Sequence, residues 1–298
     1  MLGKKGLAVY RKLAEAEWAK IPQLHPGASE EYGKRFRITS MMEALARASD
    51  DIEALVAVMS RDLSHAYHYF QIAEEYKKAR LHDKALEWAE RGVKAFPERT
   101  DSRLRDFLAE EYHRRKRHDE AMKLIWAEFT DHADIGNYRK LAGHAKRISE
   151  WPAWREKALT FLREFIIKAR KKQSQSRWDH VPDRSTLVEI FLWEKDYETA
   201  WKEAKEGGCG NHLWLGLAAK REKDYPEGAL EVYKQQVEPT VNQKNNDAYK
   251  KAVTYLVKVR DLMERLDRGA DFMSYLESVR IQHKIKRNFM KSIDSVRW

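Results

Sequence analysis

Small and aromatic positions recur along the middle of the chain with a spacing of 36 residues, the difference between positions 73 and 109. The segments are Ala73-Glu74-Glu75-Tyr76 with His82-Asp83-Lys84-Ala85, and Ala109-Glu110-Glu111-Tyr112 with His118-Asp119-Glu120-Ala121. A small residue, an aromatic three positions later and a second small residue nine positions after that let two antiparallel helices pack closely. The pattern therefore predicts a repeated helix-turn-helix unit.

Apolar positions at helical spacing predict further helices on both sides of these two units. One helix is expected over residues 7–20, and two shorter ones over residues 40–48 and 52–61 would complete a cap on the array. Beyond residue 137 the pattern weakens but stays helical. Two long helices are expected near the end of the chain, over about 245–266 and 271–296.

The first unit, about residues 66–97, resembles a tetratricopeptide repeat. Small residues stand at the positions where that family needs them, an aromatic residue follows in the first helix, and a proline closes the unit; these are Ala73, Tyr76, Ala85, Gly92 and Pro97. The second unit, about residues 102–133, keeps Ala109, Tyr112 and Ala121 but departs from the pattern at Glu128 and Ala133. The resemblance implies an all-α fold, a right-handed α-solenoid of tetratricopeptide-like helix pairs with extra terminal helices.

Four segments are expected along the chain. They are N-terminal helices that cap the array over 1–64, the repeats and following helices over 65–169, a polar connection over 170–186, and degenerate helical repeats over 187–298. The connection is assigned because its residues are polar and show no apolar period. Residues Pro97 to Asp101 are expected to form the turn between the two clear units, and Ser102 is the expected N-cap of the next helix.

A wider resemblance covers roughly residues 45–295. Several helical stretches are similar to the C-terminal region of bacterial SWIM zinc-finger proteins: 61–64, 82–92, 107–112, 189–194 and 286–291. The zinc site of that family needs three cysteines and a histidine, whereas this chain has one cysteine, so no zinc-binding role carries over to any residue. We expect either a C-terminal piece of such a protein or a relative without the finger.

The composition bears on the charge of a partner and on the cellular location, and less on the function itself. The chain has 57 Lys and Arg against 47 Asp and Glu, a net charge of +10 spread over almost every segment. This excess favours an acidic partner, nucleic acid or an acidic peptide, but it also fits ordinary solvated helix faces. A single cysteine, Cys209, excludes an intrachain disulfide and suits a cytoplasmic location. No apolar run approaches the roughly 20 residues of a membrane span.

The tetratricopeptide resemblance implies that the first helix of each unit lines a groove. The groove residues expected from it are Tyr67, Phe70, Lys77, Lys78, Arg103, His113 and Arg114. Cations held beside aromatic surface on rigid helices suit an acidic protein segment or a terminal carboxylate. The alternative is that these residues are ordinary solvated charges on helix faces.

A second candidate lies at the C-terminus, where Arg280, Lys284, Arg287 and Lys291 form a basic stripe on one predicted helix. An apolar stripe accompanies it: Ile281, Ile285, Phe289, Ile293 and Val296. A basic stripe can contact phosphates, so it predicts nucleic-acid binding as the alternative function. A terminal helix that caps a solenoid would show the same two stripes.

We find no catalytic constellation in the sequence. His65 and His68 near Asp62 lack a recognisable further metal ligand. The glycine-rich run from Gly207 to Gly210 has no Lys-Ser/Thr pair after it and is expected to end a helix. The sequence therefore predicts a non-enzymatic scaffold without cofactor, metal or small-molecule substrate, whose partner is a protein with an acidic segment.

Overall fold

The computed structural model describes residues 4–28, 32–98, 100–173 and 183–298. Over these residues the chain forms 16 α-helices. They are α1 Lys4–Trp18, α2 Tyr32–Ala48, α3 Ile52–Met59, α4 Ala66–Lys78, α5 His82–Ala95, α6 Ser102–Arg114, α7 His118–Asp131, α8 Ile135–Arg147, α9 Trp151–Gln173, α10 Ser185–Trp193, α11 Tyr197–Gly207, α12 Asn211–Arg221, α13 Pro226–Val241, α14 Asn246–Arg265, α15 Gly269–His283 and α16 Arg287–Asp294. The expected all-α fold is confirmed.

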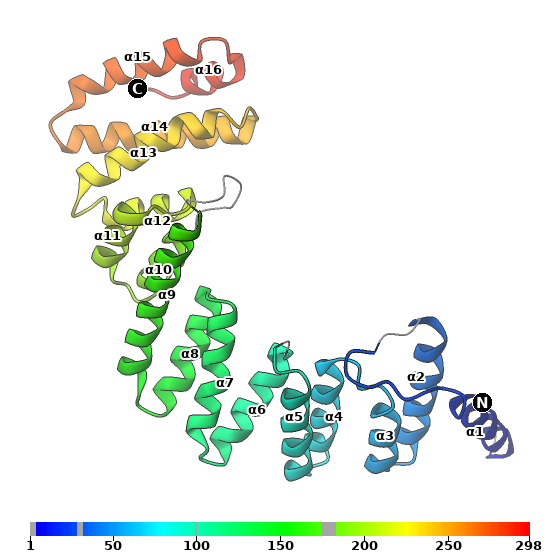
Figure 1. The fold of residues 1–298 in the computed structure, drawn as a ribbon. Helices are drawn as coiled ribbons and strands as arrows, with labels where there is room; N and C mark the ends of the chain where they lie inside the picture. Colours follow the sequence, from blue (N-terminus) through cyan, green and yellow to red (C-terminus); the bar gives the residue numbers. More distant parts are fainter. Residues whose placement is uncertain (1–3, 29–31, 99, 174–182) are drawn as a thin grey trace. The chain divides into compact units, whose positions relative to one another are not determined.

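Two compact units divide the chain, residues 1–154 and 155–298, with the boundary inside α9. Within each unit, consecutive helices pack in pairs (Figure 1). In the first unit α4 packs on α5 and α6 on α7, and α4 also contacts α6, the next first helix along the chain. In the second unit α10 packs on α11 and α13 on α14. This sequential packing is that of a helical repeat.

The turn inside several pairs has one backbone form. A residue with positive φ follows the first helix, at Arg80 after α4 and Lys116 after α6. The next amide then bonds the carbonyl five residues back: Leu81 N donates to Tyr76 O and Arg117 N to Tyr112 O, both at 2.9 Å. This is the Schellman arrangement, which satisfies carbonyls at a helix end. Ser149, Lys195 and Asp267 repeat it at later turns.

Gly92 confirms the small position expected in the first repeat. Its place on α5 is so close to α4 and α6 that a Cβ atom would lie 2.6 Å from Tyr69 Cβ and 2.7 Å from Leu104 Cδ2. Ala73 and Ala85, the other small residues of the pattern, are fully buried. The 36-residue period therefore reflects helices that approach more closely than larger side chains allow.

The two patterned tyrosines share a hydrogen-bond arrangement. Tyr76 Oη donates to Glu53 of α3, and Tyr112 Oη donates to Glu90 of α5, each at 3.0 Å. Burial and the neighbouring carboxylate raise the pKa of both tyrosines to about 12. Since Glu53 on α3 has the role of Glu90 on α5, the pair α2 and α3 is arranged like a repeat that precedes the two clear ones.

Several boundaries differ from those expected. Helix α2 begins at Tyr32, well before residue 40. Asp101, not Ser102, caps α6, because its side chain accepts a hydrogen bond from Arg103 N at 2.9 Å. Of the polar connection expected over 170–186, residues 174–182 lie outside the described residues, the first four residues continue α9, and Ser185 begins α10.

The glycine-rich run after α11 ends that helix, as expected. Gly208 is its C-cap with φ 77°, a conformation that glycine adopts readily. Cys209 follows in the same turn, and burial raises its pKa to about 12. The thiol is therefore protonated at neutral pH and a poor nucleophile.

Candidate partner-binding site

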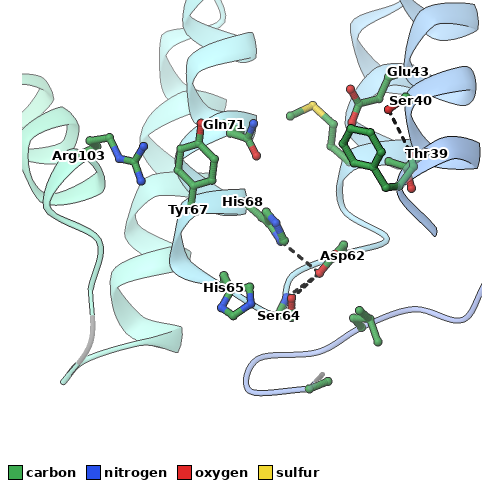
Figure 2. A pocket seen from close by; sticks show the side chains of 14 residues that line it. Thr39, Ser40, Glu43, Asp62, Ser64, His65, Tyr67, His68, Gln71 and Arg103 are labelled. Carbon is green, nitrogen blue, oxygen red and sulfur yellow. Dashed lines mark hydrogen bonds and ion pairs between the residues drawn. The ribbon is translucent and has the colours of Figure 1, made fainter. Parts of the chain in front are cut away.

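A cavity of about 640 Å³ lies in the first unit between α2 and α4 (Figure 2). Its lining comes from the connection between α1 and α2, from α2, from the end of α3 and the connection after it, from α4 and from the first turn of α6. The apolar lining residues are Leu24, Ala28, Phe36 and Met59; the polar ones are Thr39, Ser40, Glu43, Asp62, Ser64, His65, Tyr67, His68, Gln71 and Arg103. This mixture of apolar surface and converging polar groups is typical of a binding site.

Helical spacing brings these side chains together. Phe36, Ser40 and Glu43 recur every three to four residues along α2, and Tyr67 and Gln71 are one turn apart on α4, so each set shares a helix face. Figure 2 shows Glu43 on the α2 side of the cavity and the α4 side chains opposite it. The cavity thus lies between the first helices of two successive pairs.

Asp62 organises the floor of the cavity. Its Oδ1 accepts hydrogen bonds from Ser64 Oγ at 2.6 Å and Ser64 N at 3.1 Å, and His68 Nδ1 lies 3.1 Å away in an ion-pair contact (Figure 2). Burial raises the pKa of Asp62, but the Ser64 hydrogen bonds and the His68 charge outweigh it, so the pKa lies below its usual value. Asp62 is therefore ionised at neutral pH.

Glu43 is the second carboxylate of the cavity. It makes no hydrogen bond or ion pair with any other described residue of the chain. Burial raises its pKa above the usual value, the charge of Arg47 opposes this, and Glu75 adds to it. Arg47 itself bonds Glu75 through two nitrogens, at 2.9 and 3.2 Å. Glu43 is thus a partly desolvated acceptor to which none of the described residues donates.

Arg103 and Tyr67, two of the predicted groove residues, meet at the α6 side of the cavity. The guanidinium carbon lies 4.1 Å from the centre of the Tyr67 ring. Arg103 also forms an ion pair with Asp101 at 2.7 Å and lowers the pKa of that carboxyl by hydrogen bonding. The positive charge of Arg103 is therefore already matched by a carboxylate.

Four other predicted groove residues lie on α4 and α6 and contact side chains of the same two helices. They are Phe70, Lys77, Lys78 and Arg114. Phe70 packs edge-on against Phe107, with 6.2 Å between ring centres, and Lys77 Nζ lies 4.8 Å from the centre of the same ring. Lys78 pairs with Glu75 at 3.0 Å, and Arg114 pairs with Glu111 at 2.8 Å. We call Tyr67, Phe70, Lys77 and Arg103 the α4–α6 surface; Phe107 itself is buried beneath it.

The groove prediction is wrong for His113, because this residue is only 4 % exposed. Its Nδ1 lies 2.9 Å from His118 Nδ1 on α7, and its ring stacks on His144 of α8 at 5.0 Å. Burial, together with the charges of His144, Arg147 and His118, lowers the pKa of His113 to about 4. The side chain faces α7 and α8 and is not available to a partner.

The C-terminal basic stripe does not lie on one helix. Arg280 is on α15, Lys284 is its C-cap, and Arg287 and Lys291 are on α16, which packs on α14. Arg280 pairs with Asp294 at 2.7 Å. The apolar stripe divides in the same way, since Phe289 and Ile293 are buried whereas Ile285 is 83 % exposed. The nucleic-acid role stays a prediction, and the single helix that motivated it is divided into two.

Most of the cavity lining was not among the predicted groove residues. Thr39, Glu43 and Gln71 carry no motif, and the expected helix over 40–48 covered only part of α2. The spacing of Glu53 and Glu90 could have pointed to these residues. Each glutamate accepts a hydrogen bond from the tyrosine of the next helix pair, which extends the repeat back to α2 and α3.

No model of a known protein family matches the chain, and no curated protein matches it significantly. The resemblance to SWIM zinc-finger proteins therefore stays a prediction. Within the described residues, no helix is long and apolar enough to cross a membrane. The same residues contain no group of three or more histidine, cysteine or acidic side chains placed to hold a metal ion.

Proposed function

We propose that the protein is a non-enzymatic scaffold, a right-handed tetratricopeptide-like solenoid, that binds a segment of another protein. The segment would lie along the α4–α6 surface and enter the cavity between α2 and α4. The observation that carries this proposal is the cavity itself, which opens between first helices of successive pairs and has Tyr67 and Arg103 at its α6 side. First helices of such repeats supply a rigid face for an extended or helical segment.

The observations that support a binding site here do not equally support the acidic partner predicted for it. Each lysine and arginine of the predicted groove has a carboxylate of this chain beside it: Asp101 for Arg103, Glu75 for Lys78, and Glu111 for Arg114, with Lys77 3.9 Å from Glu111. An acidic segment would have to displace or share these carboxylates. The proposal therefore rests on the shape and aromatic surface of the site, and the acidic partner stays a prediction.

The test uses a matched pair of tyrosines. Tyr67 carries Arg103 over its ring at 4.1 Å, and Tyr225, far from the cavity in sequence and 50 % exposed, carries Arg221 over its ring at 4.1 Å. Immobilised wild type, Tyr67→Ala and Tyr225→Ala are compared for the proteins that they retain from a lysate of the native cells, with circular dichroism as the folding control.

We expect at least one protein to be retained by wild type and Tyr225→Ala and lost with Tyr67→Ala. Identical retention by all three proteins would overturn the proposal, because the surface around Tyr67 would then contribute nothing to partner capture.

A further inference from the structure

We propose that the cavity between α2 and α4 takes the guanidinium group of an arginine side chain in the bound protein segment. This inference rests on the proposed function and adds the chemistry of the residue that the cavity recognises. It reverses the charge predicted for the segment at this point of the site.

The charges of the cavity lining favour a cationic guest. Its lining contains two carboxylates, Glu43 and Asp62, and one permanent cation, Arg103. Arg103 is matched by Asp101, which does not line the cavity, and Asp62 has Ser64 and His68 beside it. Glu43 has no such partner among the described residues. Outside the lining, the charge of Arg35 acts on Asp62 and that of Arg47 on Glu43, but Arg47 is hydrogen-bonded to Glu75. Glu43 is therefore the lining carboxylate whose oxygens, among the described residues, stay open to the donors of a cationic guest.

The cavity lining also supplies hydrogen-bond groups. Glu43 offers two acceptor oxygens, and the carboxamide of Gln71 and the hydroxyl of Tyr67 make no hydrogen bond with the described part of the chain. Thr39 Oγ1 is buried and likewise has no hydrogen-bond partner there. A guanidinium has five N–H donors in a planar fork, so it can serve several acceptors at once.

The apolar part of the lining would receive the rest of the side chain. Leu24, Phe36 and Met59 supply apolar walls, and Phe36 is 60 % exposed. Arginine buries its methylene stem along apolar surface and places its planar head on aromatic rings and carboxylates. The volume of about 640 Å³ also leaves room for residues that flank the arginine.

The experiment follows the methyl group of Met59, one of eight methionines in the chain, by NMR of protein with labelled methionine methyls. The probes are the peptide acetyl-Ala-Ala-Arg-Ala-Ala-amide, its citrulline, lysine and glutamate versions, and free arginine. Citrulline keeps the shape of arginine without the charge. Met59→Leu assigns the resonance, and the exposed Met273 serves as the remote reference.

We expect the arginine peptide to shift the Met59 resonance saturably and to bind at least tenfold more tightly than the citrulline peptide. Glu43→Gln should remove this preference while the fold is unchanged by circular dichroism. Glu74→Gln is the matched control, since it deletes one charge on α4 outside the cavity lining and should keep the preference. Tighter binding of the peptide than of free arginine assigns the site to a protein segment.

Equal affinity for the arginine and citrulline peptides, tighter binding of the glutamate peptide, or no shift of Met59 with any probe would each overturn the arginine proposal. If Tyr67→Ala still abolishes partner capture in those cases, the scaffold function stands and only the chemistry of the cavity is wrong. If capture is also insensitive to Tyr67, both proposals fail. A lysine peptide that binds as tightly as the arginine peptide would overturn the choice of a guanidinium.

Discussion

The two clear repeats have the same helix lengths and turn, yet their interiors are built differently. In the first repeat Gly92 of α5 lies against Tyr69 and Leu104. In the second repeat the residue 36 positions after Gly92 is Glu128, a buried carboxylate 3.5 Å from Lys140, and the residue 36 positions after Tyr69 is Arg105, which pairs with Asp131. Close apolar packing in one repeat is thus replaced by paired charges in the next.

The two repeats share their turn and a few side-chain positions, while the rest of their interiors differ. Both units have the Schellman turn and the tyrosine bonded to a glutamate of the preceding helix. A glutamate can replace the small residue at position 128 because an ammonium from α8 lies nearby, and buried charges are tolerated when they are paired. The departures from the repeat pattern therefore mark different packing and not a different fold.

The largest effect is expected from giving the first repeat the residue of the second. Gly92→Glu would place a carboxylate against Tyr69 and Leu104, where the packing leaves no room for even a Cβ atom. Steric overlap and an unpaired buried charge should lower the free energy of unfolding by about 3 kcal/mol or more. Urea unfolding measures this, and Gly92→Ala gives the steric part alone. A Gly92→Glu protein as stable as wild type would contradict the close packing.

The second prediction concerns His113, a buried histidine that stands 36 positions after the exposed Lys77. The folded-state pKa of His113, about 4, lies below its unfolded value of about 6.5, so the unfolded chain binds the proton first as the pH falls. Stability should therefore be complete above pH 6.5 and should decrease by about 3 kcal/mol as the pH falls to 4.

Urea unfolding at a series of pH values measures this decrease. His113→Phe should flatten it between pH 6.5 and 4, whereas replacement of the exposed His212 by phenylalanine should leave it unchanged. A wild-type profile that stays level over this interval would refute the buried neutral histidine.

The third prediction concerns Lys140, which lies 3.5 Å from the buried Glu128 and 2.8 Å from the more exposed Asp106. Lys140→Met should leave the buried carboxylate without its ammonium and lower the free energy of unfolding by about 2 kcal/mol. Arg147→Met is the matched control on the same helix, because Arg147 and its partner Glu110 are both about half exposed. Its loss should change stability by less than about 1 kcal/mol. Equal effects of the two variants in thermal unfolding would argue against a special role for Lys140.

The smallest effect should come from the shared turn. Arg80 and Lys116 both have φ near +60°, a conformation that costs a non-glycine residue about 1 kcal/mol. Arg80→Gly and Lys116→Gly should each stabilise the protein by about 0.5–1 kcal/mol, less any gain in unfolded-state entropy. Similar shifts in melting temperature would confirm that the two turns are equivalent. Destabilisation by either glycine would show that its side chain contributes contacts of its own.

The sequence predicted the parts of the fold that depend on local pattern. Gly92, Ala85 and Tyr76 have a spacing that only close helix pairs require, so the paired helices were predictable. The break between α15 and α16 was not, because residues 271–296 keep a helical period through the turn at Lys284 to Lys286. The burial of His113 was also missed, because it depends on His118 and His144 from two other helices.

The candidate site could be predicted only in part for the same reason. Tyr67 and Arg103 follow from the repeat pattern, whereas Glu43 enters the site because α2 lies across the cavity from α4. Within the described part of the chain Glu43 forms no ion pair, because Arg47, one turn away on the same helix, bonds Glu75 instead.

The most direct measurement is a selection of random peptides displayed on phage against immobilised wild type and Glu43→Gln. We predict that wild type enriches peptides with an arginine at one fixed position and that Glu43→Gln loses this enrichment. Failure of wild type to enrich any sequence above background would contradict the proposed scaffold function. Enrichment of acidic peptides that is unchanged in Glu43→Gln would contradict the assignment of the cavity to arginine.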